Sequence, residues 1–331
     1  MNVESLRVFM MLLIVIMHLS GGSIDLDAVR SYYSINNLWI LCYRSITYLG
    51  VPCFAFISGY YGIKCNYRKF WRLECMALFY GTLIIAINFA MSHPLGFVEI
   101  RNLLLPASSC HLWYYSAYFL LALISPFITP TIQQMSNYQL LKSSVLLLSV
   151  SYLSRTVIMG FGNDFILLLS IYVIGQLLRR YPHNVFQRKA LLIFFICQFA
   201  NFVIIFLLLY VEKGRLSRYF DGSANPLTVL SSVCLFYIFL NINKDRFILR
   251  KIAIFAPSML AVYMFHEGFR LSGAVDLSFL HADLIYIFPF SCIILIVISL
   301  FELCRGKILK GIENKTYDTI KVYVNRRIMT L

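Results

Sequence analysis

Residues 7 to 18 read Arg-Val-Phe-Met-Met-Leu-Leu-Ile-Val-Ile-Met-His, so a single Arg and a single His enclose an apolar run. Such runs cross membranes as helices, because the hydrocarbon core offers the backbone no other hydrogen-bond partners. On a helix the step from Arg7 to His18 is just over three turns, which places both on one face roughly 16 Å apart. Ionisable residues inside a membrane are costly and usually functional. This stretch therefore predicts a membrane helix that carries a site.

The rest of the chain has the composition of a membrane protein. Its 331 residues are 60% hydrophobic and only 13% charged, whereas about a quarter of the residues in a soluble domain are charged. We expect an all-α, polytopic transmembrane helix bundle with about ten spans, in the cytoplasmic (inner) cell membrane as a multi-pass protein. The expected spans are 5–22, 38–62, 69–91, 112–130, 141–159, 163–178, 190–210, 226–241, 252–269 and 280–304.

The net charge is +14, and the distribution of the basic residues along the chain agrees with the expected topology. If the N-terminus is cytoplasmic, most Lys and Arg residues fall in cytoplasmic segments, as the positive-inside rule requires. An even number of spans then places both termini in the cytoplasm, and no nucleic-acid partner is needed to explain the basic charge. Arg44 lies within an expected span and is expected to extend toward the outer surface.

We divide the chain into a transmembrane domain, residues 1–304, and a basic cytoplasmic tail, residues 305–331. Anionic lipid is expected to attract this tail to the inner membrane surface. The nine cysteines form no CxxC pair, so neither a metal site nor a disulfide framework is predicted.

Five local patterns stand out along the chain. They are Asn-Val-Glu-Ser-Leu-Arg at 2–7 followed by His18, Gly-Val-Pro-Cys-Phe-Ala-Phe-Ile-Ser-Gly-Tyr at 50–60, Lys-Phe-Trp-Arg at 69–72, His-Leu-Trp-Tyr-Tyr-Ser-Ala-Tyr at 111–118, and Ser-Met-Leu-Ala-Val-Tyr-Met-Phe-His at 258–266. Together they resemble the acyltransferase-3 family of integral-membrane acyltransferases. The resemblance covers residues 2 to about 270, and the order and spacing of the patterns make it specific.

Members of this family commonly have ten helices and transfer acyl groups, often acetyl, from a cytoplasmic coenzyme-A thioester to cell-surface sugars. The resemblance thus implies a membrane-bound O-acyltransferase whose donor substrate is acyl-CoA, with acetyl-CoA as the expected donor, and with no permanently bound cofactor. Its other expected partners are a polysaccharide or glycan-lipid acceptor and membrane lipid.

His18 is the first catalytic candidate, because imidazole titrates near neutrality and can take the proton of an attacking sugar hydroxyl. It can also carry the acyl group transiently. The alternative is a histidine that only hydrogen-bonds to a neighbouring helix. Arg7 can hold the phosphates or pantetheine carbonyls of coenzyme A, or simply flank the membrane on the cytoplasmic side. Glu4 can orient Arg7 as an i,i+3 pair.

A basic cluster opens the third expected span. Arg68, Lys69 and Arg72 are predicted to bind the nucleotide phosphates of coenzyme A, together with Arg7. The alternative is topology alone, because every expected cytoplasmic loop is basic. Glu74 can neutralise Arg72 or Arg7.

Further candidates lie on the path of the acceptor. For Ser58 and Tyr60 a packing role and a ligand role are both open, and Gly59 between them permits close helix approach. Trp113 and Tyr114 can instead belong to an interfacial aromatic belt. The predicted substrate-binding residues are Ser58, Tyr60, His111, Trp113, Tyr114 and Tyr263.

His266 is predicted to orient the acceptor or to support His18, and is therefore a catalytic candidate with His18 and Arg7. The expected topology places His18, His111 and His266 at a common depth, and Glu267 can tune either neighbouring histidine.

The main alternative function is a polytopic transporter or flippase for a glycan or an acylated intermediate, because intramembrane charges also mark transport pathways. No repeat of the two halves is detectable, which speaks against this alternative. A non-catalytic scaffold in polysaccharide assembly is the weaker alternative, and it requires that the histidines be dispensable.

Overall fold

The computed structural model describes residues 2–64, 66–109, 111–156, 163–181, 185–242 and 247–328. All regular secondary structure in these ranges is helical, which confirms the predicted all-α fold. The α-helices are α1 (Asn2–Gly22), α2 (Leu26–Val29), α3 (Ile35–Thr47), α4 (Gly50–Tyr61), α5 (Tyr67–Ala90), α6 (Phe97–Leu104), α7 (Pro106–Ser109), α8 (Trp113–Gln134), α9 (Asn137–Thr156), α10 (Asn163–Arg179), α11 (Val185–Tyr210), α12 (Pro226–Asn241), α13 (Phe247–Ala253), α14 (Met259–Leu271) and α15 (Leu284–Ile328).

Each of the expected spans contains a helix. Within the described residues, seven helical stretches are long and apolar enough to cross a membrane, and α12 is a shorter apolar helix. The chain is therefore a multi-pass membrane protein, while the number of spans and the side of each terminus remain predictions. The second expected span consists of two helices, α3 and α4, and the ninth contains α13 and α14. The last residues of the span expected at 141–159 lie outside the described residues.

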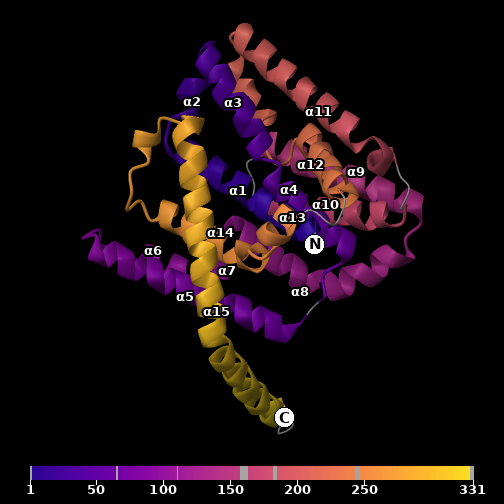
Figure 1. Ribbon diagram of the computed structural model, residues 1–331. Coiled ribbons are helices and arrows are strands. Elements are labelled where there is room, and N and C mark those ends of the chain that lie inside the picture. The colour runs from indigo at the N-terminus through magenta and orange to yellow at the C-terminus, as the bar shows by residue number, and fades with distance from the viewer. Residues whose placement is uncertain are drawn as a thin grey trace.

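Helix α1 lies inside the bundle, where it contacts α3, α4, α12, α13, α14 and α15 (Figure 1). Its residues 8–17 are apolar on all sides, which suits a helix surrounded by other helices. Gly50 allows α4 to approach closely, because a Cβ atom at this position would lie 2.5 Å from Ile14 Cγ1. This packing fixes the helix that carries Arg7 and His18.

The end of α1 that carries His18 is held by a buried cation. Arg44, on α3, is only 2% exposed, so the expectation that it extends to the surface is wrong. Its Nη1 donates to the Met17 carbonyl oxygen at 3.1 Å and to Ser20 Oγ at 2.5 Å. The last carbonyls of a helix lack partners within the helix and attract cations. Arg44 stays buried because α1 supplies these acceptors.

Helices α4 and α10 also pack through glycine. A Cβ atom at Gly59 would overlap the backbone of Tyr172, and one at Gly175 would lie 2.6 Å from the Tyr60 nitrogen. The two backbones therefore touch at this point, which confirms the role of Gly59 in close helix approach.

Helix α15 continues without a break through the expected domain boundary at 304 and extends past the rest of the bundle (Figure 1). A buried ion network stabilises this continuation: Arg305 donates to Glu302 Oε2 at 2.6 Å and to Glu313 Oε1 at 2.6 Å. The Trp71 indole of α5 donates to the Glu313 carbonyl oxygen at 3.1 Å. Residues 305–328 thus form a helix that packs against α5, and residues 329–331 of the expected tail lie outside the described residues.

Candidate active site

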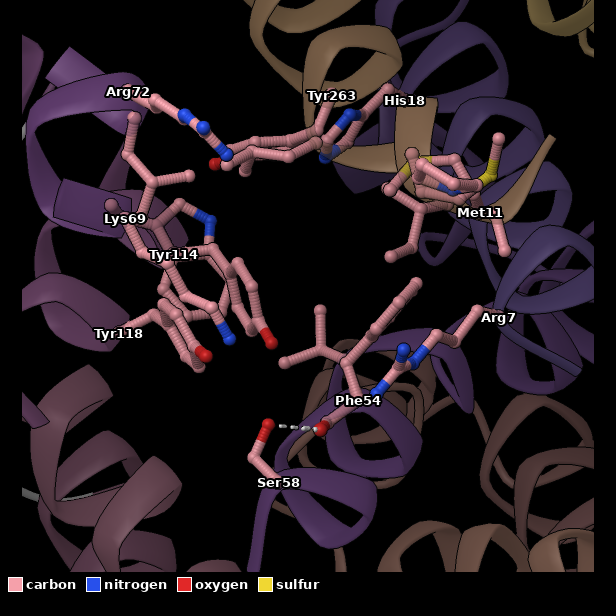
Figure 2. Close-up of a pocket in the computed structure, with 18 residues that line it drawn as sticks. Arg7, Met11, His18, Phe54, Ser58, Lys69, Arg72, Tyr114, Tyr118 and Tyr263 are labelled. Carbon is pink, nitrogen blue, oxygen red and sulfur yellow. Dashed lines mark hydrogen bonds between the residues drawn. The ribbon is translucent and has the colours of Figure 1, made fainter. Parts of the chain in front are cut away.

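A cavity of about 640 Å³ lies among α1, α4, α5, α8 and α14, and its volume is within the range of small-molecule sites. Figure 2 shows it with His18, Tyr263 and Arg72 on one side and Arg7, Phe54 and Ser58 on the other. Eight of the residues predicted from the sequence line this cavity: Arg7, His18, Ser58, Lys69, Arg72, Trp113, Tyr114 and Tyr263.

Helices α1 and α14 meet at the histidines. His18 Nδ1 lies 2.9 Å from His266 Nε2 and 3.0 Å from Glu267 Oε2. His266 and Glu267 are 7% and 4% exposed, and they lie behind His18, outside the lining of the cavity. A contact between residues so far apart in the chain arises only because the two helices pack together.

The hydrogen bonds determine which nitrogen of each ring carries the proton. His266 Nδ1 lies 2.5 Å from the Val262 carbonyl oxygen, which can only accept, so Nδ1 is protonated. In the neutral ring Nε2 of His266 is then an acceptor. His18 Nδ1 faces this acceptor and the Glu267 carboxylate, and therefore carries a proton itself. The lone pair of neutral His18 is left on Nε2, the nitrogen available for a proton from a ligand in the cavity.

Glu267 is held as a carboxylate by Arg270, one turn further along α14. Arg270 Nε and Nη2 donate to Glu267 Oε2 and Oε1 at 2.7 and 2.8 Å, a bidentate pair of the strong charge-assisted kind. The carboxylate orients the His18 ring and can stabilise the imidazolium that forms when Nε2 takes a proton. This arrangement, a histidine with an acidic partner behind it, suits a general base.

The basic residues that line the cavity have different surroundings. Arg7 Nη1 donates to both oxygens of Glu4 at 3.0 Å, so the expected i,i+3 pair is formed. Lys69 is exposed and therefore lies on the open side of the cavity. Arg72 Nη2 donates to Asn314 Oδ1 of α15 at 2.7 Å. The expected partner Glu74 instead accepts a hydrogen bond from the Tyr115 hydroxyl at 2.7 Å.

Four predicted site residues lie outside the lining of this cavity: Tyr60, Arg68, His111 and His266. Tyr60 packs in an aromatic cluster, with its ring centroid 4.8 Å from that of Phe236. Arg68 is paired with Asp318 at 2.5 Å on the surface of α15. Tyr60 is thus held by aromatic packing and Arg68 by an ion pair, and their roles in ligand binding remain predictions.

His111 lines a separate cavity of about 10 Å³ beside Leu103 and Met264, so it does not join the pair of His18 and His266. Burial lowers the pKa of His111 below its ordinary value. His111 is separated from His18 and His266 because side chains at a similar depth in the membrane can face different neighbouring helices.

Comparison with known families agrees with this geometry. The family model described as an acyltransferase domain, of the acyltransferase-3 type, matches residues 2–302. The chain belongs to the acyltransferase-3 family. Its matched region includes every residue that lines the cavity. The comparisons found no significant match among curated proteins or solved structures.

In this acyltransferase-3 protein, one group of described residues could hold a metal ion. The ligand atoms of His18, His266 and Glu267 lie within 4.8 Å of one another. These atoms already hydrogen-bond among themselves, and Arg270 engages both oxygens of the carboxylate. The expectation that the protein needs no metal remains a prediction.

Two residues that hold polar side chains of the cavity in place, Glu267 and Asn314, were not among the predicted site residues. Glu267 was expected only to tune a histidine, but its carboxylate contacts the His18 ring directly. The sequence signal was Arg270, which is three residues further along and pairs with Glu267. Asn314 contacts Arg72 from residues beyond the matched region, and no local pattern marks it.

Proposed function

We propose that this protein is a membrane-bound O-acyltransferase that moves an acyl group, acetyl in our proposal, from cytoplasmic acyl-CoA to a hydroxyl of a cell-surface or exported polysaccharide. We place it in the cytoplasmic (inner) membrane. One observation carries the proposal: a single cavity is lined both by a histidine with an available Nε2 and by three basic side chains, Arg7, Lys69 and Arg72.

The basic side chains suit an anionic donor. Lys69 and Arg72 are proposed to meet the phosphates of acyl-CoA at the open side of the cavity, because clustered cations bind phosphate strongly. Arg7 lies about three turns from His18 along α1. A long, flexible thioester arm can therefore contact Arg7 while its acyl end reaches His18.

The reaction follows from the tautomer of His18. Nε2 takes the proton of the sugar hydroxyl as the oxygen attacks the thioester carbonyl, and the new carbon–oxygen bond forms. The carbon–sulfur bond then breaks, and the thiolate leaves and takes the proton from Nε2, which gives free coenzyme A. Glu267 stabilises the imidazolium between these steps, and His266 keeps the ring oriented.

The acceptor is proposed to contact the aromatic residues of the cavity. Trp113, Tyr114 and Tyr263 line it beside His18, and such side chains combine apolar surface with hydrogen-bonding groups. Ser58 Oγ donates to the Phe54 carbonyl oxygen at 3.0 Å (Figure 2), so its lone pairs remain available to a ligand. The surrounding apolar helices exclude water and so limit hydrolysis of the thioester.

The test uses the purified protein reconstituted in sealed lipid vesicles, with acetyl-CoA and candidate glycans. Thiol release and the mass of the glycan are measured for the wild type, for His18→Ala and for the control His281→Asn, which alters an exposed histidine. Acceptor-dependent thiol release in the wild type and the control, with at least a hundredfold loss in His18→Ala, is the expected result for loss of a general base. Glycan movement across the membrane without thiol release would overturn the proposal in favour of a transporter.

A further inference from the structure

Tyr263 carries a buried hydroxyl without a hydrogen-bond partner. The residue is 3% exposed, and its Oη has no hydrogen-bond partner among the described residues. It faces the backbone amide of Tyr114 in the first turn of α8, an interaction in which the hydroxyl could only accept. The hydroxyl proton therefore has no acceptor. An unsatisfied buried polar group costs about 1–3 kcal/mol, so its presence needs an explanation.

Tyr263 belongs to the lining of the cavity, and its ring lies beside His18, the proposed base. Tyr263 lines the cavity, and its ring centroid is 6.3 Å from that of His18 and 5.9 Å from that of Tyr114 (Figure 2). Among the described buried side-chain atoms without partners, Tyr263 Oη and Arg72 Nε are those whose residues line the cavity. Arg72 is already held by Asn314, whereas the Tyr263 hydroxyl is free to donate.

We propose that the Tyr263 hydroxyl is the oxyanion donor of the transfer reaction. This inference rests on the proposed function. As the sugar oxygen attacks, the π electrons of the thioester carbonyl move onto its oxygen, and Tyr263 donates a hydrogen bond to the resulting oxyanion while keeping its own proton. When the carbonyl re-forms, the carbon–sulfur bond breaks and the thiolate accepts the proton from His18 Nε2.

This role accounts for the missing partner. A donor that waits for a charge present only in the transition state stabilises that state without first breaking another hydrogen bond. A hydroxyl already paired with protein would have to exchange partners during the reaction. The rigid surroundings of the ring, between His18, His266 and Tyr114, keep the donor in place.

Tyr263→Phe removes only the oxygen atom. We expect the turnover number to fall about 10²- to 10³-fold, as for loss of one oxyanion donor, with the KM for acetyl-CoA within about twofold of the wild type. The midpoint of thermal unfolding should change little, because the hydroxyl proton has no protein acceptor to lose.

The control is Tyr172→Phe, which changes another buried tyrosine. The Tyr172 hydroxyl pairs with Thr129 Oγ1 at 3.0 Å and does not line the cavity. Tyr172→Phe should lower the unfolding midpoint and keep the turnover number, which is the reverse of the pattern expected for Tyr263→Phe.

The outcomes separate the two proposals. If the wild type releases no coenzyme A with any acceptor, the proposed function fails. If the wild type is active and Tyr263→Phe keeps its turnover number within about threefold, the oxyanion role is refuted. Loss of donor affinity in proportion to the loss of rate would also refute it, because Tyr263 would then bind the ground state and the transition state equally.

Discussion

Replacing Glu267 by Gln tests the acidic partner of His18 most directly. Gln keeps the shape of the side chain and one oxygen that can accept from His18 Nδ1, but it removes the negative charge. The wild-type carboxylate lies 3.0 Å from that nitrogen. The variant therefore changes the electrostatic stabilisation of the imidazolium while leaving the cavity lining unchanged, since Glu267 does not line it.

The size of the effect follows from this distance. Unit charges about 3 Å apart interact by about 5 kcal/mol at an effective dielectric constant of about 20. Arg270 already pairs with both carboxylate oxygens and offsets part of this stabilisation. We take about 3–4 kcal/mol as the remainder, which corresponds to a roughly 100- to 1000-fold lower turnover number. The KM for the donor should change little.

The assay is the rate of coenzyme-A release at saturating donor and acceptor, measured beside the thermal unfolding midpoint. Glu302→Gln is the matched control, because Glu302 is also buried and also pairs with an arginine three residues further along. Both variants should lose stability, since each removes a charged partner from an arginine, the half-buried Arg270 or the buried Arg305. Equal turnover numbers in the two variants would refute the role of Glu267 in catalysis.

Three further predictions concern the basic residues. Arg7→Ala should weaken binding to immobilised coenzyme A and Arg7→Lys should restore it only in part, because an ammonium lacks the planar fork; unchanged affinity in both would leave Arg7 a topological role only. Lys69→Ala combined with Arg72→Ala should raise the KM for acetyl-CoA by more than about 100-fold, since each of the two charged contacts contributes roughly 1.5–3 kcal/mol. Added salt should weaken the wild type in the same way. A loss of turnover at saturating donor with normal KM would contradict this. Asn314→Ala should raise the KM for acetyl-CoA about two- to tenfold, because the loss of its hydrogen bond to Arg72 costs about 0.5–1.5 kcal/mol. The control Thr316→Ala should leave this KM unchanged. Equal KM values in the two variants would show that α15 does not position Arg72.

The positions of the helices were readable from the sequence, because local composition decides them. An apolar segment of sufficient length must form a helix in lipid, and each expected span does contain one. The face shared by Arg7 and His18 follows from helical periodicity alone. The i,i+3 pair of Glu4 and Arg7 has the same local origin.

The assembly of the site was decided only by the tertiary structure. Helix packing brings His266 behind His18 and keeps His111 in a separate cavity, although all three were expected at one depth. Sequence periodicity gives the direction of a side chain about its own helix, but it does not say which helix that face meets.

Contacts between helices also decide the surroundings of Arg44 and Arg72. Arg44 is buried because the end of α1 offers it carbonyl oxygens, and Asn314 reaches Arg72 because α15 continues as one helix along α5. The sequence by itself determined the membrane helices, the family and eight of the residues that line the cavity. The partners of His18 and Arg72 lie on other helices, more than 240 residues away in the chain, and no local pattern encodes such contacts.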